Sequence, residues 1–213
     1  MSMRSRVRVL LDEAGTTFAA EAGISMLNKP RPLYRLLVLS VLLSTRIKAE
    51  LAVAAARELA DFGTPERMFE ATWQQRVDAL DRANYTRYDE STSSALGRGA
   101  ELVLDEYRGD LRRMRAKADG DIEELHRLLT ALPRLGPVGA DVFCREVQLV
   151  WPELRPYFDD KALVGAEKLE LPTDPHQLAE LVEGHELAKL AAALVRTGKS
   201  RSLAAEVTDV ART

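Results

Sequence analysis

Two prolines and two glycines lie close together in the stretch Ala131-Leu132-Pro133-Arg134-Leu135-Gly136-Pro137-Val138-Gly139-Ala140-Asp141-Val142-Phe143. A helical apolar pattern ends at Pro133, because the residue before a proline is disfavoured in the α conformation. Helical periodicity resumes at Ala140. Gly136 permits a positive φ, and Pro137 suits the start of a helix, where a missing N–H costs nothing. The stretch therefore predicts a helix, a tight hairpin and a second helix.

Such a hairpin presents the unpaired amides at the start of its second helix. The helix dipole adds partial positive charge, so this position favours an anion, most often a phosphate. We expect the amides of Val138, Gly139 and Ala140 to serve here, with Arg134 as a cation beside them. A purely structural turn that binds no ligand remains the alternative.

The composition bounds the class of protein. The chain has 213 residues, of which 46% are hydrophobic and 30% charged, as in soluble globular proteins. No apolar run reaches the roughly 20 residues of a membrane span, and the N-terminus does not resemble a signal peptide, so we expect a cytoplasmic protein. The single cysteine, Cys144, excludes an internal disulfide and a four-cysteine iron–sulfur or metal site. No cofactor or metal is expected.

Helical periodicity extends along the whole chain. Residues 33–45 are almost continuously apolar, which predicts a buried central helix. Thr64-Pro65-Glu66 is a typical helix start, with a threonine cap followed by proline. No segment alternates with the period of two expected for a strand. The predicted fold class is all-α.

Three stretches together resemble a known family. The pattern Leu132-Pro133-x-Leu135-Gly136-x-x-x-Ala140 resembles the hairpin of the endonuclease III-like helix-hairpin-helix (HhH-GPD) DNA glycosylases. Residues 37–46 resemble the family's buried helix, which ends in Leu-Leu-Ser-x-Gln. Trp151-Pro152 and Phe158-Asp159-Asp160-Lys161 resemble the family's Trp-Pro and Val-Asp-Thr-His. The resemblance covers about residues 30–163.

This resemblance implies two helical domains and an interdomain cleft. Residues 30–149 would form a helical barrel that contains the helix-hairpin-helix at about 121–150. Residues 1–29 and 150–213 would join as the second domain. Many relatives carry an iron–sulfur cluster near the C-terminus, but the corresponding tail here has no cysteine, so a member without the cluster is expected.

The resemblance also implies a chemistry, the removal of a damaged or mispaired base. Breaking an N-glycosidic bond builds positive charge on the sugar, which a carboxylate can stabilise while it activates water. Asp159 matches the family's catalytic aspartate, and Asp160 takes the role if the alignment shifts by one residue. Either aspartate could instead simply cap the next helix. Val138 stands where bifunctional members have a lysine nucleophile, so monofunctional hydrolysis without strand cleavage is expected.

The same comparison assigns a DNA-binding surface. The residues expected to contribute are Arg134, Leu135, Gly136, Pro137, Val138, Gly139 and Ala140 of the hairpin, Arg46 at the family's plugging position, and Tyr85 and Tyr88 in the region that supplies a wedge. The expected partner is double-stranded DNA, bound by a monomer. A DNA-binding protein without catalysis is one alternative. A helical interaction protein without a nucleic-acid role is another, since the net charge is −3.

Overall fold

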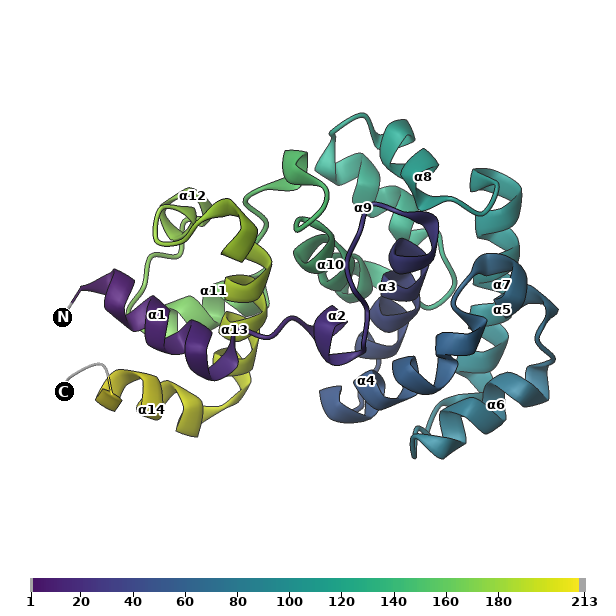
Figure 1. Ribbon diagram of the computed structural model, residues 1–213, viewed down its shortest axis with the longest axis horizontal. Coiled ribbons are helices and arrows are strands. Elements are labelled where there is room, and N and C mark those ends of the chain that lie inside the picture. Colours follow the sequence, from purple (N-terminus) through teal and green to yellow (C-terminus); the bar gives the residue numbers. More distant parts are fainter. Residues whose placement is uncertain (1, 211–213) are drawn as a thin grey trace. The chain divides into compact units, whose positions relative to one another are not determined.

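The computed structural model describes residues 2–210, and all regular secondary structure in this part of the chain is helical. No strand occurs in these residues, so the prediction of an all-α fold is confirmed. Figure 1 shows the helices in chain order. No described helix has the length and hydropathy that a bilayer span requires.

The chain divides into two compact units. Residues 19–143 form one, called the middle unit here, and the chain before and after them forms the other, called the terminal unit. Both boundaries fall earlier in the chain than the domain boundaries proposed at 29/30 and 149/150. The second boundary, between Phe143 and Cys144, lies inside a helix, where no break in periodicity marks it.

The middle unit contains most of the helices. They are α2 (Phe18–Glu21), α3 (Pro30–Leu43), α4 (Ala49–Glu58), η1 (Leu59–Phe62), α5 (Pro65–Glu70), α6 (Trp73–Arg82), α7 (Asp89–Tyr107), α8 (Leu111–Ala118), α9 (Ile122–Thr130) and α10 (Gly136–Val147). The first residue of α2, Phe18, and the end of α10 belong to the terminal unit. The apolar helix α3 is buried along nearly its whole length, as expected, and packs on α4 and α8. Helix α7 packs on α5 and α6.

Side-chain caps place the starts of α5 and α6. The hydroxyl of Thr64 accepts a hydrogen bond from the amide of Arg67, and Pro65 follows in the first turn, as predicted. Thr72 and Gln75 form a capping box at the start of α6, each side chain bonded to the other's backbone amide. These caps satisfy amides that have no partner within the helix.

A buried arginine joins α5, α6 and α7. Arg76 donates hydrogen bonds to the carbonyl oxygens of Met68 (2.9 Å), Ala71 (2.5 Å) and Ser93 (3.0 Å). Burial lowers the pKa of its guanidinium group. Because two of these carbonyl groups lie at the end of α5 and the third lies in α7, Arg76 ties both helices to α6.

The terminal unit is centred on α13. Its elements are α1 (Met3–Ala14), η2 (Pro152–Leu154), α11 (Asp160–Lys168), α12 (Pro175–Ala179), η3 (Gly184–Glu186), α13 (Leu187–Lys199) and α14 (Arg201–Val210). Helix α13 packs on α1, α11 and α14. Gly165 permits the close approach of α11, since a Cβ atom there would overlap the carbonyl oxygen of Leu194.

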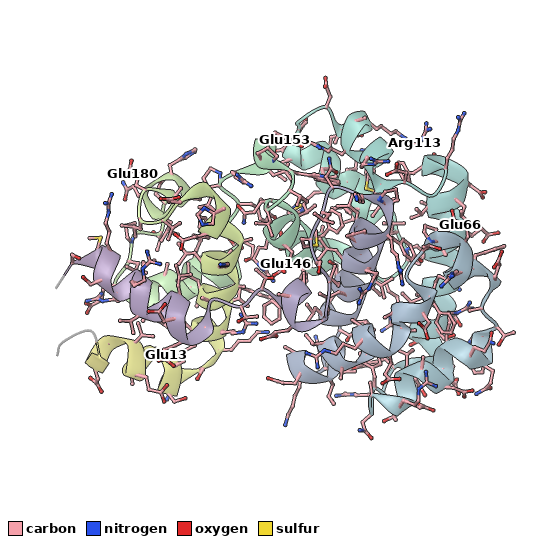
Figure 2. The ribbon with its side chains drawn as sticks, in the orientation of Figure 1. Glu13, Glu66, Arg113, Glu146, Glu153 and Glu180 are labelled. Carbon is pink, nitrogen blue, oxygen red and sulfur yellow. The ribbon has the colours of Figure 1, made fainter. Side chains whose placement is uncertain are left out.

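Charged side chains lie mainly on the outside of each unit. Glu13, Arg113 and Glu180 are exposed examples (Figure 2). Glu146 is an exception: it is buried in the terminal unit, and its carboxylate accepts a hydrogen bond from the amide of Phe18 at 3.2 Å.

Candidate functional site

The predicted hairpin lies between α9 and α10. Its backbone is left-handed at two positions, with φ of 61° at Arg134 and 58° at Gly136. Glycine adopts this conformation readily, whereas for arginine it costs on the order of 1 kcal/mol. Pro137 falls in the first turn of α10, as the sequence predicts.

The hairpin amides differ in their availability. The amide of Gly139 already donates to the carbonyl oxygen of Leu135 at 3.1 Å, so this amide is not free for an anion. The amides of Gly136 and Val138 have no acceptor within the described residues. The start of α10 therefore offers the amide of Val138, as predicted, together with that of Gly136.

Not every hairpin side chain faces solvent. Leu135 and Ala140 are buried and pack into the middle unit, so their side chains are not available to a ligand. This burial corrects the expectation of a contact from Leu135, whereas the contribution expected of Ala140 came from its backbone amide. Pro137 is exposed, and Val138 is 36% exposed. Position 138, which was compared with a lysine in the sequence analysis, is thus open to solvent.

The hairpin is fixed against the C-terminal end of α3. Ser44 Oγ, just after α3, donates to the carbonyl oxygen of Arg134 at 3.1 Å. The two backbones also approach closely, since a Cβ atom at Gly139 would lie 3.3 Å from the carbonyl oxygen of Ser40. Gly139 therefore has a packing role.

This junction forms an open hollow of about 370 Å³. It is lined by Ser44, Thr45, Arg46, Tyr88 and Arg134, and we call it the Arg46 hollow. Arg46, Tyr88 and Arg134 were each predicted as DNA contacts from separate stretches of sequence. None of the described residues that line the hollow is acidic, and Arg46 has no hydrogen-bond or ion-pair partner among the described residues. The hollow is therefore electropositive.

Two guanidinium groups lie close to the ring of Tyr88. The guanidinium carbon of Arg134 is 5.5 Å from the centre of the Tyr88 ring, and that of Arg87 is 5.2 Å from it. Both distances are within the range of cation–π attraction. Arg134 Nη1 also donates to Ser91 Oγ at 2.6 Å, which orients the guanidinium group along the rim of the hollow.

Tyr85 does not belong to the surface, contrary to prediction. Its side chain is completely buried, and its hydroxyl group shares a hydrogen bond of 2.8 Å with Thr45 Oγ1. Burial raises the pKa of Tyr85. This hydrogen bond ties the turn before α7 to the end of α3, so Tyr85 holds Tyr88 near Arg46 instead of contacting a base.

The two candidate catalytic aspartates lie in the terminal unit. Asp159 caps α11, where its Oδ1 accepts from the amide of Ala162 at 3.3 Å. Its Oδ2 is 2.6 Å from Nη1 of Arg145, and the two side chains are only 4% and 3% exposed, respectively. Asp160, the first residue of α11, is exposed and has no ion-pair or hydrogen-bond partner among the described residues. The capping role considered for this pair thus falls to Asp159.

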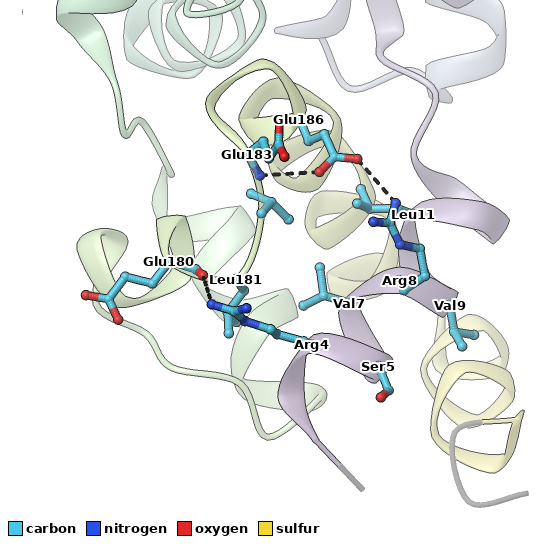
Figure 3. A pocket seen from close by; sticks show the side chains of 11 residues that line it. Arg4, Ser5, Val7, Arg8, Val9, Leu11, Glu180, Leu181, Glu183 and Glu186 are labelled. Carbon is cyan, nitrogen blue, oxygen red and sulfur yellow. Dashed lines mark hydrogen bonds and ion pairs between the residues drawn. The ribbon is translucent and has the colours of Figure 1, made fainter.

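A larger hollow, of about 670 Å³, lies in the terminal unit between α1 and the segment around η3 (Figure 3). Arg4 donates to the carbonyl oxygen of Glu180, and Arg8 forms an ion pair of 3.3 Å with Glu186. With Glu183, the three glutamates outnumber the two arginines. This hollow is therefore not suited to an anion. Within residues 2–210, no three His, Cys, Asp or Glu side chains are grouped to hold a metal ion.

Comparison with known proteins gives a fold-level similarity. No protein-family model and no curated protein matches the sequence. Two solved structures are similar at 16% identity, each alignment covering 92% of this chain and 85% of the other: a trapped covalent endonuclease III–DNA intermediate, described as an estranged-adenine complex (TM-score 0.48), and a non-covalent endonuclease III–DNA complex (TM-score 0.49).

Sequence reasoning missed the hydroxyl groups around the Arg46 hollow. Ser44 and Thr45 directly precede Arg46 in the sequence, so their place beside Arg46 could have been predicted. Ser91 lies 43 residues from Arg134, and no local pattern connects the two.

Proposed function

We propose that this protein is a monofunctional DNA glycosylase that holds a DNA strand at the Arg46 hollow. The observation that carries the proposal is the convergence of Arg46, Tyr88 and Arg134 on one electropositive hollow beside the start of α10. Guanidinium groups and free amides both bind phosphate, and a partly exposed tyrosine can stack on a base.

Hydrolysis of the N-glycosidic bond would transfer the bond's electron pair to the departing base and leave positive charge on the sugar. A carboxylate would stabilise that charge and accept a proton from the attacking water. The family resemblance assigns this role to Asp159. The exposure of Asp160 favours Asp160 for this role instead, because Arg145 already neutralises Asp159. Valine at position 138 has no nucleophile, which supports hydrolysis without strand cleavage.

DNA binding is tested by titrating a labelled duplex at several salt concentrations. Phosphate contacts make affinity fall with salt, and the loss of one such contact lowers the slope of log K against log salt by about one. We expect this change for Arg46→Ala and for Arg134→Ala. Arg113→Ala removes an exposed cation of α8 that does not line the Arg46 hollow, and it should behave as wild type. An absence of binding at low salt would reject the proposal.

Catalysis is tested on duplexes that carry oxidised, alkylated, deaminated or mismatched bases, followed by alkali to cleave abasic sites. We expect wild-type protein to release one class of base. Asp160→Asn should abolish release at unchanged DNA affinity if Asp160 is the catalytic carboxylate, and Asp159→Asn should do so if Asp159 is. Urea denaturation of each variant separates lost activity from lost folding, because Asp159 belongs to a buried ion pair. If both variants release the base as fast as wild type, neither carboxylate is catalytic.

A DNA-binding protein without catalysis is the second candidate. It is favoured by one observation, the buried Asp159–Arg145 ion pair, because both interactions of this carboxylate serve to stabilise the terminal unit. Salt-dependent binding without base release from any substrate would support it.

A further inference from the structure

A second hollow, of about 460 Å³, shares a wall with the Arg46 hollow. It is lined by Trp73, Arg87, Tyr88, Asp89, Glu90, Ser91 and Ser94, and we call it the Trp73 hollow. Tyr88 lines both hollows. Ser91, in the wall of the second hollow, accepts the hydrogen bond of Arg134 from the first. The two hollows are therefore neighbouring parts of one surface of the middle unit.

Trp73 is fixed in place yet uncovered. Its indole Nε1–H donates to Ser94 Oγ at 3.1 Å, and its carbonyl oxygen accepts from Ser93 Oγ at 2.9 Å. These bonds hold the first residue of α6 against α7. The side chain is nevertheless 41% exposed, which leaves a large aromatic surface in contact with water. An indole held in one orientation loses little conformational entropy when a flat ligand stacks on it.

The charges of the two hollows differ. The Arg46 hollow has two guanidinium groups and is not lined by any acidic residue of the described chain, which suits a phosphate. The Trp73 hollow has one guanidinium group, from Arg87, and two carboxylates, from Asp89 and Glu90. Its net negative charge disfavours phosphate. A neutral flat group with N–H donors fits it better, since carboxylates accept from the exocyclic amino groups of bases.

We propose that the Trp73 hollow is a subsite for one unpaired nucleobase, which stacks on the indole of Trp73 and lies beside Tyr88. The phosphate of the same strand would occupy the neighbouring Arg46 hollow. This inference rests on the proposed function, because it extends the same DNA-binding surface. It adds a preference: the protein binds a duplex with an unpaired nucleotide more tightly than a fully paired one.

The test compares a duplex that carries one bulged nucleotide with a fully paired duplex of the same length, both titrated at the same salt concentration. The loss of one aromatic–base stack weakens binding by about tenfold or more. We therefore expect Trp73→Ala to remove a preference of about tenfold for the bulged duplex, and Trp73→Phe to keep most of it. Phe69→Ala is the matched control: Phe69 is 51% exposed on the adjacent helix α5 but does not line the hollow.

Tryptophan fluorescence supplies an independent readout. The chain has two tryptophans, and Trp151 is completely buried, so a change on addition of the bulged duplex reports on Trp73. We expect quenching in wild type and its loss in Trp73→Ala.

The inference is overturned if wild type and Trp73→Ala share the same preference, or if wild type has none. Failure of the proposed function would give a different result, because wild type would then bind neither the bulged nor the paired duplex in a salt-dependent way. If binding depends on Arg46 and Arg134 but not on Trp73, only the subsite is rejected.

Discussion

Nη1 of Arg145 lies 2.6 Å from Oδ2 of Asp159, and both side chains are almost completely buried. Such a pair strongly resists the loss of one partner, because the remaining charge stays buried without compensation. The residue that the family resemblance marks as catalytic is thus also a structural residue of the terminal unit. Any measurement of its chemistry has to separate activity from stability.

We accordingly expect Arg145→Met to lower the free energy of unfolding by about 3–5 kcal/mol. The double variant Arg145→Met/Asp159→Asn should recover part of this loss, since it leaves no unpaired buried charge. Asp160→Asn should change stability by no more than about 0.5 kcal/mol, because Asp160 is exposed. Urea denaturation of the four proteins is the measurement. A double variant no more stable than Arg145→Met would contradict the explanation that an unpaired buried carboxylate destabilises the single variant.

Arg134 combines an unfavourable backbone conformation with a binding role, and two substitutions separate them. Arg134→Gly and Arg134→Ala both remove the guanidinium group, but only glycine tolerates a φ of 61° without strain. The glycine variant should be more stable than the alanine variant by about 1 kcal/mol. Both should weaken DNA binding equally in the duplex titration. Equal stability would mean that this turn stores no strain.

Two glycines should respond in opposite ways to an added methyl group. A Cβ atom at Gly165 would overlap the carbonyl oxygen of Leu194, so Gly165→Ala forces α11 away from α13 and should cost roughly 3 kcal/mol. At Gly99, within α7, the nearest atom would be Pro133 Cδ at 4.0 Å. Gly99→Ala should therefore stabilise the protein by about 0.5–1 kcal/mol, because alanine is the better helix residue. Thermal unfolding of both variants measures the contrast, and a neutral Gly165→Ala would contradict the packing described for α11.

Position 138 offers a gain-of-function test of the hairpin. Val138 is 36% exposed, so Val138→Lys should fold normally and present an amine at the start of α10. If DNA lies on the hairpin as proposed, that amine should form a Schiff base with an abasic site, which borohydride converts to a stable adduct. Wild type serves as the control and should give no adduct. A variant that binds abasic DNA but is not trapped would show that the sugar lies elsewhere.

The lowered pKa of Asp110 predicts that the stability of the protein depends on pH. It caps α8 and accepts from the Arg112 side chain, with Nη2 at 2.6 Å from Oδ2, and this hydrogen bond holds the pKa of its carboxyl group below its ordinary value. A lowered pKa in the folded state gives stability that is present above the unfolded pKa and is lost as pH falls through the folded one. The stability difference between wild type and Asp110→Asn should therefore shrink below about pH 4. Urea unfolding at a series of pH values checks this, and a difference that grows with acidity would reject it.

Local sequence patterns were enough to predict an all-helical chain and the hairpin. Helix starts such as Thr64-Pro65 and the turn at Gly136 follow from local rules, because a cap or a left-handed residue depends only on its immediate neighbours. The apolar run of α3 predicted its burial for the same reason. The resemblance added Arg46, Tyr88 and Arg134, and the structure brings these three to one hollow.

Which of these side chains reach solvent depends on contacts between segments that are distant in the sequence. Tyr85 and Tyr88 lie three positions apart in one turn, yet packing buries the first against Thr45 and leaves the second at the surface. The same holds for Asp159 and Asp160, since Arg145 pairs with one of them. Each outcome depends on a partner from a separate segment, and the sequence pattern around a residue carries no information about a partner that folding brings to it.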